Sequence, residues 1–586
     1  MPRLALSFVP DARDGACRVE RTREGARVHY AAPAMAVRTV GALLADLVPE
    51  GGALEERSPF TLFGIMLDCS RNAVMRVDHL ERWLRRLALL GYNAVLLYTE
   101  DTYELPGEEY FGYLRGAYTP DEIRRIDAYA RREGIEVIPC IQALGHLEQI
   151  LKWPAYDTVR DTASVLLVGA EETYALIAKM LDLWSGSCGT RRIHIGMDET
   201  HDLGRGRFLD LFGHEGGFAI FNRHLARVKA LCDERGLRPM IWSDMYFRLG
   251  SRTGDYYDRD SVIPPDVVEK IPPGVQLVYW DYYHPDESFY LDWIERHRLL
   301  GSEPVMGSGV WTWGKFWHDR FLTEANAGAC LQACRQAGLR EVFFALWGDD
   351  GAYCDFDSAF GGLGWAAEKA YAGTVDAARL AGRFQAVFAA DYRAVELACG
   401  LNRILEPAPV LWDDPLLAQY LQHVRARDPE ALSRARAEYE SLAAALDPHA
   451  AQEGAGCIAH ARLVCRVLSR KVDLAERLFQ AYTSDEGDGL RAVRQEIPGM
   501  RQALRELADS LRAVWLAHNK PFGLEVLQIR LGGLRARYEE LEQRLQEYLE
   551  EKVESIAELE ANLQQPPAGE LGRREYHHLA TSSCIL

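Results

Sequence analysis

Eight short apolar runs constrain the fold of this chain more than any other feature of its sequence. Each run ends in polar or aromatic residues and is followed by a charged, amphipathic stretch. The runs are residues 63–70, 94–100, 137–144, 192–199, 238–245, 275–282, 305–313 and 342–350. Their starts are 30 to 55 residues apart, which leaves room for a crossover helix between parallel strands. Eight such units predict an α/β fold, a (β/α)8 TIM barrel.

The composition of the runs and of the segments between them supports this barrel. The runs are almost continuously apolar, as expected for a parallel sheet that is buried on both faces. Residues 78–91 and 118–134 have the acidic start and the glycine stop of helices. The barrel is therefore predicted to span residues 58–370.

The rest of the chain divides into three predicted segments. Residues 371–563 are rich in Ala, Leu, Arg and Glu with helical periodicity, which predicts a C-terminal α-helical domain. Its last stretch, 534–563, has heptad-like spacing, and we expect it to pack against the barrel rather than form a coiled coil. Residues 1–57 are predicted to form a small N-terminal region, and 564–586 a disordered tail.

Charge and composition exclude several functional classes. The 586 residues include 67 Lys and Arg against 86 Asp and Glu, a net charge of −19, which disfavours nucleic acid or an anionic membrane as a partner. We find neither a signal peptide nor an apolar stretch near membrane-spanning length. The twelve cysteines are scattered, without the paired spacing of a metal site. We therefore expect a reduced, cytoplasmic protein.

The eight runs end in many chemically active side chains. In a (β/α)8 barrel the active site lies at the carboxyl ends of the strands, so the residues that close each run are the candidate site. In chain order they include Asp68, Arg71, Tyr98, Glu100, Asp101, His146, Asp198, Glu199, Trp242, Asp244, Trp280, Tyr282, Tyr283, Trp311, Trp313, Trp347, Asp349 and Asp350. A barrel with a purely structural role would not need such residues at every strand end.

The adjacent carboxylates Asp198 and Glu199 close the fourth run. A carboxyl group in an aromatic pocket has a raised pKa and can act as a general acid, while a neighbour in a polar environment stays ionised. Tryptophans with carboxylates and an arginine also suit a sugar ring, whose apolar faces stack on indoles while its hydroxyls need polar partners. Taken alone, however, the pair could equally cap a helix on a barrel loop.

Several of these segments, in barrel order, resemble the family 20 glycoside hydrolases, the β-N-acetylhexosaminidases. The family signature H-x-G-x-D-E appears as His194-Ile195-Gly196-Met197-Asp198-Glu199, with Met197 where Gly is commoner. Five other segments match: LDCSR with Arg71, YTED with Glu100, ALGH with His146, IWSD with Trp242, and LWGDD with Trp347 and Asp349. The resemblance covers roughly residues 60 to 365 and, with the short N-terminal region, implies a short, intracellular, exo-acting bacterial type.

The resemblance implies substrate-assisted retaining hydrolysis of terminal β-linked GlcNAc or GalNAc, without metal or cofactor. Glu199 would protonate the glycosidic oxygen and later deprotonate water, while the acetamido oxygen of the sugar attacks C1 to form an oxazolinium intermediate. Asp198 would accept the acetamido N–H, Arg71 would bind sugar hydroxyls, and His146 would pair with the acid that ends the second-strand segment YTED. The substrate is then a glycan or glycoconjugate with a terminal N-acetylhexosamine.

The sequence departs from the family at the seventh strand. Many relatives carry there a Tyr-x-Asp pair whose tyrosine holds the acetamido oxygen, whereas this run ends in VWTWGKF. Tyr282 or Tyr283 is the candidate replacement, and the residues do not decide between them. Asp349, Asp350 or Glu100 would replace the missing aspartate.

Other positions stay open on the sequence alone. Trp242, Trp280, Trp313 and Trp347 are expected to bind the sugar, although Trp311 and Trp313 share a strand face and could instead pack the barrel rim. Asp244 and Asp281 could bind either backbone or substrate.

Two other functions remain to be weighed. One is a different hydrolase of N-acetylated sugars, O-GlcNAcase-like or chitinase-like. The other is a catalytically inactive barrel that binds carbohydrate, which the retained Asp198-Glu199 pair disfavours. The helical domain or a second subunit, in a homodimer, would complete the rim of the pocket.

Overall fold

The predicted barrel is present and closed. The computed structural model describes residues 4–11, 15–452 and 456–563. Eight parallel strands form a ring in the order β5 to β12, and β12 closes it on β5 through pairs such as Phe344↔Ile65. The strands are β5 Leu62–Asp68, β6 Ala94–Tyr98, β7 Glu136–Cys140, β8 Arg192–His194, β9 Arg238–Trp242, β10 Gln276–Trp280, β11 Val305–Gly309 and β12 Glu341–Leu346. All eight predicted strands are confirmed, and each starts within one residue of its prediction.

One strand is shorter than its apolar run. β8 ends at His194, four residues before Asp198, because Gly196 and Met197 have φ angles of 68° and 75°, which extended backbone does not allow. The carboxylate pair therefore lies on an irregular segment beyond the strand.

Helices surround the barrel, and shorter ones lie in the loops. The longer helices are α2 Val77–Leu90, α3 Pro120–Arg132, α5 Glu171–Ser187, α7 Gly217–Glu234, α10 Glu287–Arg298, α11 Arg320–Ala337 and α12 Phe360–Ala372. The loops carry α4 Glu148–Leu151, η1 Pro154–Tyr156, α6 Arg207–Phe212, α8 Asp244–Gly250, α9 Pro265–Val268, η2 Asp349–Gly351 and η3 Phe356–Ala359. The predicted acidic start and glycine stop are present: Asp121 and Glu122 lie in the first turn of α3, and Gly91 ends α2 at φ 98°. Thr119 and Glu122 also form a capping box on α3, which was not predicted.

A small sheet precedes the barrel. Its strands β1 Ala5–Pro10, β2 Ala16–Arg21, β3 Gly25–Tyr30 and β4 Ala53–Arg57 lie in the order β1-β3-β2-β4, and α1 Pro33–Leu44 packs on it. Buried Arg38 of α1 pairs with Glu56 of β4 and with Glu368 of α12, each at 2.9 Å. Arg383 also contacts Glu368, at 2.9 Å. A buried ionic network thus joins this sheet to the barrel helices.

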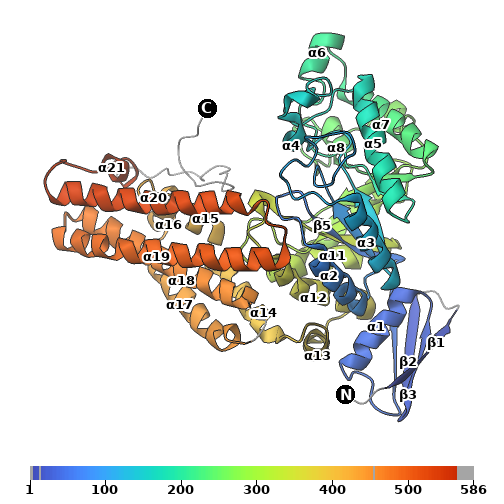
Figure 1. Cartoon of the computed structure of the whole chain (residues 1–586), viewed down its shortest axis with the longest axis horizontal. Helices are drawn as coiled ribbons and strands as arrows, with labels where there is room; N and C mark the ends of the chain where they lie inside the picture. Colours follow the sequence, from blue (N-terminus) through green and yellow to red (C-terminus); the bar gives the residue numbers. More distant parts are fainter. Residues whose placement is uncertain (1–3, 12–14, 453–455, 564–586) are drawn as a thin grey trace.

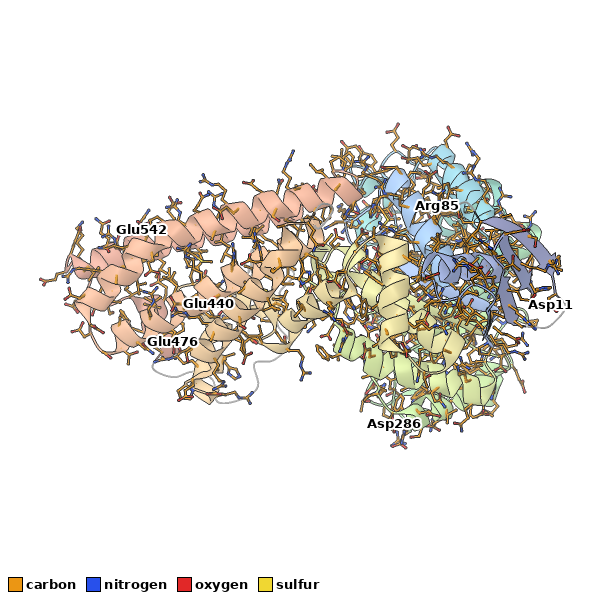
Figure 2. All side chains as sticks on the ribbon, turned by 90° about the horizontal axis from the view of Figure 1, so that it is seen from below. Asp11, Arg85, Asp286, Glu440, Glu476 and Glu542 are labelled. Atoms are coloured by element: carbon orange, nitrogen blue, oxygen red, sulfur yellow. The ribbon has the colours of Figure 1, made fainter. Side chains whose placement is uncertain are left out.

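The region after the barrel is helical, as predicted. It contains α13 Ala377–Phe388, α14 Tyr392–Cys399, η4 Gly400–Arg403, α15 Pro407–Trp412, α16 Gln419–Arg427, α17 Ala431–Ala450, α18 Gly456–Thr483, α19 Gly487–His518, α20 Leu524–Leu549 and α21 Ala557–Leu563. The helices α17 to α20 form a long arm that extends away from the barrel (Figure 1). Charged side chains, including Glu440, Glu476 and Glu542, cover this arm (Figure 2).

The expected packing of residues 534–563 against the barrel is wrong. α20 folds back along α19, and its buried residues Leu534, Tyr538, Leu541 and Leu545 follow a helical stripe within the arm. The apolar spacing was correct, but the surface that it covers is another helix of the arm.

Some predictions have no structural counterpart. The predicted tail, 564–586, lies outside the described residues, and the boundaries at 57 and 370 stay predictions. In the described part of the chain, we find no helix with the length and apolarity that crossing a membrane requires.

Candidate active site

His146 lies among three carboxylates at the carboxyl end of the barrel. Its Nε2 is 3.2 Å from Asp198 Oδ2 and 3.4 Å from Glu199 Oε2, and its Nδ1 is 4.0 Å from Glu100 Oε1. These residues follow β6, β7 and β8, so three neighbouring strands bring them together. The structure therefore joins four of the residues that the sequence predicted.

The charges of this cluster determine where its protons are held. Burial alone would lower the pKa of His146, but the Asp198 charge and the contact with Glu199 raise it well above its usual value. Burial raises the pKa values of Asp198 and Glu199, yet His146 outweighs burial and lowers both. Near neutral pH, the imidazole is thus protonated and both carboxylates are ionised.

Asp198 is held from a second side by Gln142, which is completely buried after β7. Gln142 Nε2 donates to Asp198 Oδ1 at 2.8 Å and to the Tyr98 hydroxyl at 2.9 Å, and the backbone N–H of Met197 donates to Gln142 Oε1 at 3.2 Å. A side chain at Gly196 would clash with the same Gln142 oxygen. This close approach is the physical reason for a glycine in the signature.

The backbone of the site is strained. His146 and Glu199 have φ angles of 52° and 49°, and Met197 of the signature has a φ angle of 75°. Non-glycine residues adopt such angles rarely and only where the surroundings enforce them. One such restraint is Asp244, whose Oδ2 accepts the backbone N–H of Glu199 at 3.1 Å.

Arg71 organises a second charged cluster beside the first. Its Nη1 is 3.2 Å from Glu100 Oε1 and 3.7 Å from Asp68 Oδ2, and its Nε is 3.8 Å from Asp349 Oδ1. Burial raises the pKa of Glu100 to about 7, although Arg71 acts against this shift. The guanidinium also lies 5.0 Å from the ring centres of Tyr98 and Trp347.

Aromatic rings lie beside these charged clusters at the strand ends. Trp347 packs against Tyr98 with ring centres 4.8 Å apart and against Trp242 at 6.4 Å. A second group consists of stacked Trp280 and Tyr282, at 5.4 Å, with Trp313 at 5.3 Å from Tyr282. The predicted tryptophans thus form two groups of aromatic rings at the carboxyl ends of the strands.

The two candidate tyrosines differ in position. Tyr282 is 4% exposed, and its hydroxyl interacts with Trp347 and, through their charges, with Asp198 and Asp349. Tyr283 is 50% exposed and meets the outer ring of Trp311 at 5.6 Å. Tyr282 therefore lies with the charged residues, whereas Tyr283 lies at the rim.

Other candidate positions have structural partners. The side chain of Asp281 accepts hydrogen bonds from the Tyr279 hydroxyl at 2.9 Å and from the Tyr283 backbone N–H at 3.0 Å. Asp281 therefore stabilises the local backbone at the end of β10. Trp311 stacks on Trp313 with ring centres 4.2 Å apart and donates to its carbonyl at 3.1 Å.

A cavity of about 600 Å³ opens at the opposite, amino end of the strands. Two of its charged lining residues are paired with each other, since Arg192 Nη2 contacts Glu341 Oε2 at 2.7 Å. Among the described residues, two groups of side chains are close enough to share a metal ion, His79–Asp357–His518 and Asp355–Cys457–His518. Both lie where the arm meets the barrel rather than at the strand ends.

Comparison with known proteins assigns the chain to a family. Residues 60–255 match the model of the glycosyl hydrolase family 20 catalytic domain, and residues 408–567 match the Glycoside Hydrolase 20C C-terminal domain. The two matches together cover more than half of the chain. The chain belongs to glycoside hydrolase family 20.

Similar proteins support this assignment. Hexosaminidase D of Homo sapiens is 29% identical over 236 residues, which are 38% of this chain and 46% of the human protein. Hexosaminidase D of Bos taurus is 29% identical over 223 residues, 36% of this chain and 60% of the bovine protein. The matches thus span about half the length of these curated relatives. A solved β-N-acetylhexosaminidase shares the fold, with a TM-score of 0.51 and 15% identity over 66% of this chain and 92% of its own.

The family 20 catalytic match ends at residue 255, before several site residues. Trp280, Tyr282, Trp313, Trp347 and Asp349 follow it and are placed by the barrel strands β10 to β12.

Sequence reasoning missed two residues of the site. Gln142 lies inside the third apolar run, residues 137–144, where its polarity was the only signal. Tyr256 lies in the loop after α8, and its hydroxyl is 3.3 Å from Glu199 Oε1 and contacts His201. No periodic pattern marks this loop, so Tyr256 could not be selected from the sequence.

Proposed function

We propose that this family 20 protein is an exo-β-N-acetylhexosaminidase, which removes terminal β-linked GlcNAc or GalNAc by substrate-assisted retaining hydrolysis. The observation that carries the proposal is the contact of His146 with both Asp198 and Glu199, at 3.2 and 3.4 Å, beside aromatic rings and the partly buried Arg71. The names of the relatives agree with it, since they are hexosaminidases.

Glu199 is the proposed acid and base. Before substrate binds, the proton that Glu199 uses is held by His146, 3.4 Å away. This proton returns to Glu199 when the glycosidic oxygen arrives. Glu199 then protonates the leaving oxygen as the C1–O bond breaks and the acetamido oxygen bonds to C1. In the second step Glu199 takes a proton from the water that opens the oxazolinium ring, which restores the acetamido group.

Asp198 is the proposed partner of the acetamido N–H. Because His146 and Gln142 keep it ionised and fixed, it can orient the acetamido group and stabilise the positive charge that develops on the ring. We assign the hydroxyl that holds the acetamido oxygen to Tyr282, since Tyr282 is buried and within the electrostatic influence of Asp198, while Tyr283 is half exposed.

The Arg71 cluster is the proposed binding site for hydroxyls of the terminal sugar. Arg71 supplies donors, and Glu100 and Asp349 supply acceptors. Because Glu100 is buried beneath Arg71, this cluster closes one end of the site, which supports exo-action. Trp242, Trp280, Trp313 and Trp347 supply the surfaces against which the sugar and its acetamido methyl pack.

The test is hydrolysis of the p-nitrophenyl β-glycosides of GlcNAc, GalNAc and glucose by the wild type and by Glu199→Asn and Glu199→Gln. We expect turnover of the N-acetylated substrates but not of the glucoside, and a loss of at least about a hundredfold in the variants. Turnover of the glucoside at a similar rate would exclude acetamido assistance. Thermal stabilisation by GlcNAc without turnover would support the inactive binding barrel instead.

The remaining proposals concern location and assembly. We propose a cytoplasmic protein, in line with the eleven unpaired cysteines of the described residues. We also propose a homodimer, because α6 exposes Leu211 and Phe212 at 54% and 56%. Sedimentation equilibrium measures the mass of the assembly in solution and so tests the proposed homodimer.

A further inference from the structure

We propose that Arg530, on α20 of the helical arm, is a positioning residue for Asp349, so that the arm takes part in recognising the hydroxyls of the terminal sugar. The inference rests on the proposed function, because it needs Asp349 to contact the substrate. It gives the C-terminal helical region a role in the reaction.

The argument starts from the turn that carries Asp349. The three residues after Asp349 all have left-handed backbone, with φ angles of 65° at Asp350, 99° at Gly351 and 57° at Ala352. Two of them are not glycine, so the turn is strained and needs restraints from its surroundings. Without these restraints, the backbone would relax and the Asp349 carboxylate would move.

The structure supplies a restraint on each side of Asp349. Before it, the backbone N–H of Gly348 donates to Asp68 Oδ2 at 2.9 Å. After it, the Arg530 guanidinium donates to the carbonyl of Asp350 and lies against Gly351, where an added side-chain carbon would be 3.3 Å from Arg530 Nη2. The first restraint comes from the barrel and the second from the arm.

The start of α20 is anchored, which fixes the place of Arg530. The turn between α19 and α20 docks on the barrel loops: the Lys520 backbone N–H donates to Val74 O at 2.8 Å, and its Nζ donates to Ala117 O at 2.9 Å and to Glu122 at 2.8 Å. Gly523, at φ 89°, packs so closely on Asn72 that a side chain would clash. Figure 1 shows this end of α20 against the barrel.

Arg530 lies about two turns of helix into α20, counted from the anchored connection between α19 and α20. At 1.5 Å per residue, it lies about 9 Å along α20 from Leu524. The arm therefore contacts the loops after β5 and β6 with its turn and the loop after β12 with Arg530. Arg71, Glu100 and Asp349 come from these same three loops.

Asp349 itself is available to a ligand. Its side chain is 43% exposed, and its Oδ1 is 3.8 Å from Arg71 Nε. A carboxylate beside an arginine presents an acceptor next to a donor, which matches a sugar hydroxyl that both donates and accepts. Hydrogen bonds to charged groups are strong but depend on position, so a displaced carboxylate loses them.

The experiment is a double-mutant cycle with Arg530→Met and Asp349→Ala. Met retains the length and apolar stem of Arg and removes the donors. Arg512→Met, at an exposed arginine of α19, is the matched control. For each protein, kcat and KM are measured on p-nitrophenyl β-GlcNAc and β-GalNAc, and folding is checked by the thermal midpoint.

We expect Arg530→Met to lower kcat/KM by about 10- to 100-fold, the range for one hydrogen bond to a charged group. Because the two substrates differ at a single hydroxyl, the ratio of their kcat/KM values should also change. In the Asp349→Ala background, Arg530→Met should have little further effect, since the group that it positions is gone. Arg512→Met should behave as wild type.

The outcomes separate the two proposals. No turnover of either substrate by the wild type would overturn the proposed function. Normal turnover by the wild type with an unchanged Arg530→Met, or with effects that multiply in the double variant, would overturn the role of Arg530 alone. Should Arg530→Met not fold, Arg530→Gln is used in the same cycle, because its side chain is polar but too short to reach the Asp350 carbonyl.

Discussion

Protonation of His146 determines how the candidate site responds to pH. The pKa of the His146 imidazole is raised, whereas that of the Glu199 carboxyl is lowered, so the imidazole keeps its proton at pH values where the carboxyl has lost its own. Since His146, Asp198 and Glu199 are in contact, they titrate as one unit. The proton available for catalysis is therefore lost only in the alkaline range.

We expect His146→Gln to shift the alkaline limb of kcat/KM to lower pH. The proton must then reside on Glu199, a carboxyl group whose ordinary pKa lies below that of an imidazole, although burial and Asp198 raise the pKa of Glu199. At neutral pH, kcat/KM should fall by about a hundredfold. A pH–rate profile with an unmoved alkaline limb would contradict this assignment.

Tyr282→Phe and Tyr283→Phe form a matched pair. Removal of the buried hydroxyl should lower kcat by about 100- to 1000-fold, the effect of losing one donor to a developing charge. Removal of the half-exposed hydroxyl should leave kcat within about twofold of wild type, as usual for a surface position. Steady-state kinetics decide the question, and the reverse result would transfer the role to Tyr283.

The residues show what the sequence could predict. Asp198, Glu199 and His146 stand in short motifs at strand ends, where the barrel fixes their position. The choice between Tyr282 and Tyr283 was out of reach, because it depends on β10 ending at Trp280, so that Tyr282 continues the inward face. Tyr256 depends on the path of a loop, which local sequence does not determine.

At the scale of elements, apolar runs predicted the strands well because parallel strands buried on both faces leave little room for polar residues. β8 is the exception, where Gly196 ends the strand inside its run. The packing of α20 was not predictable from its stripe, since an apolar helix face specifies burial but not the partner.

The buried network of Arg38, Glu56, Glu368 and Arg383 joins elements that are far apart in the chain. We expect Glu368→Gln to lower the free energy of unfolding by about 3 to 5 kcal/mol, because it leaves the buried Arg38 and Arg383 to share the single counter-charge of Glu56. Asp121→Asn, which removes an exposed pair with Arg124, should change it by less than about 1 kcal/mol. Urea denaturation measures both, and equal small effects would show that the network is dispensable.

At the scale of the whole molecule, His518 of α19 joins the arm to the barrel. Its Nδ1 is 2.6 Å from Asp355 Oδ2, its Nε2 is 3.9 Å from Asp357 Oδ2, and its ring stacks on His79 of α2 at 4.2 Å. Burial and Arg82 lower the pKa of His518, but the two carboxylates raise it to about 9. The folded protein thus binds this proton more tightly than the unfolded chain.

Stability should therefore fall as the pH rises through this interval. The contribution of the His518 proton is fully present below the unfolded pKa of about 6.5 and is lost as the pH rises through about 9. Its size is at most on the order of 3 kcal/mol. In His518→Gln, the thermal midpoint should depend less on pH between these values. Parallel curves for the two proteins would contradict the role of His518.

The position of Arg530 in the chain also has a consequence for biosynthesis. The barrel can close when β12 emerges from the ribosome, and by then all the proposed catalytic residues have been made. Arg530 follows Asp349 by about 180 residues, which takes about 10 to 35 s at 5 to 20 residues per second. A nascent chain that stalls within this interval would carry every predicted catalytic group and still lack the contact that fixes Asp349. Full competence toward sugars would then arise only when synthesis of the arm is nearly complete.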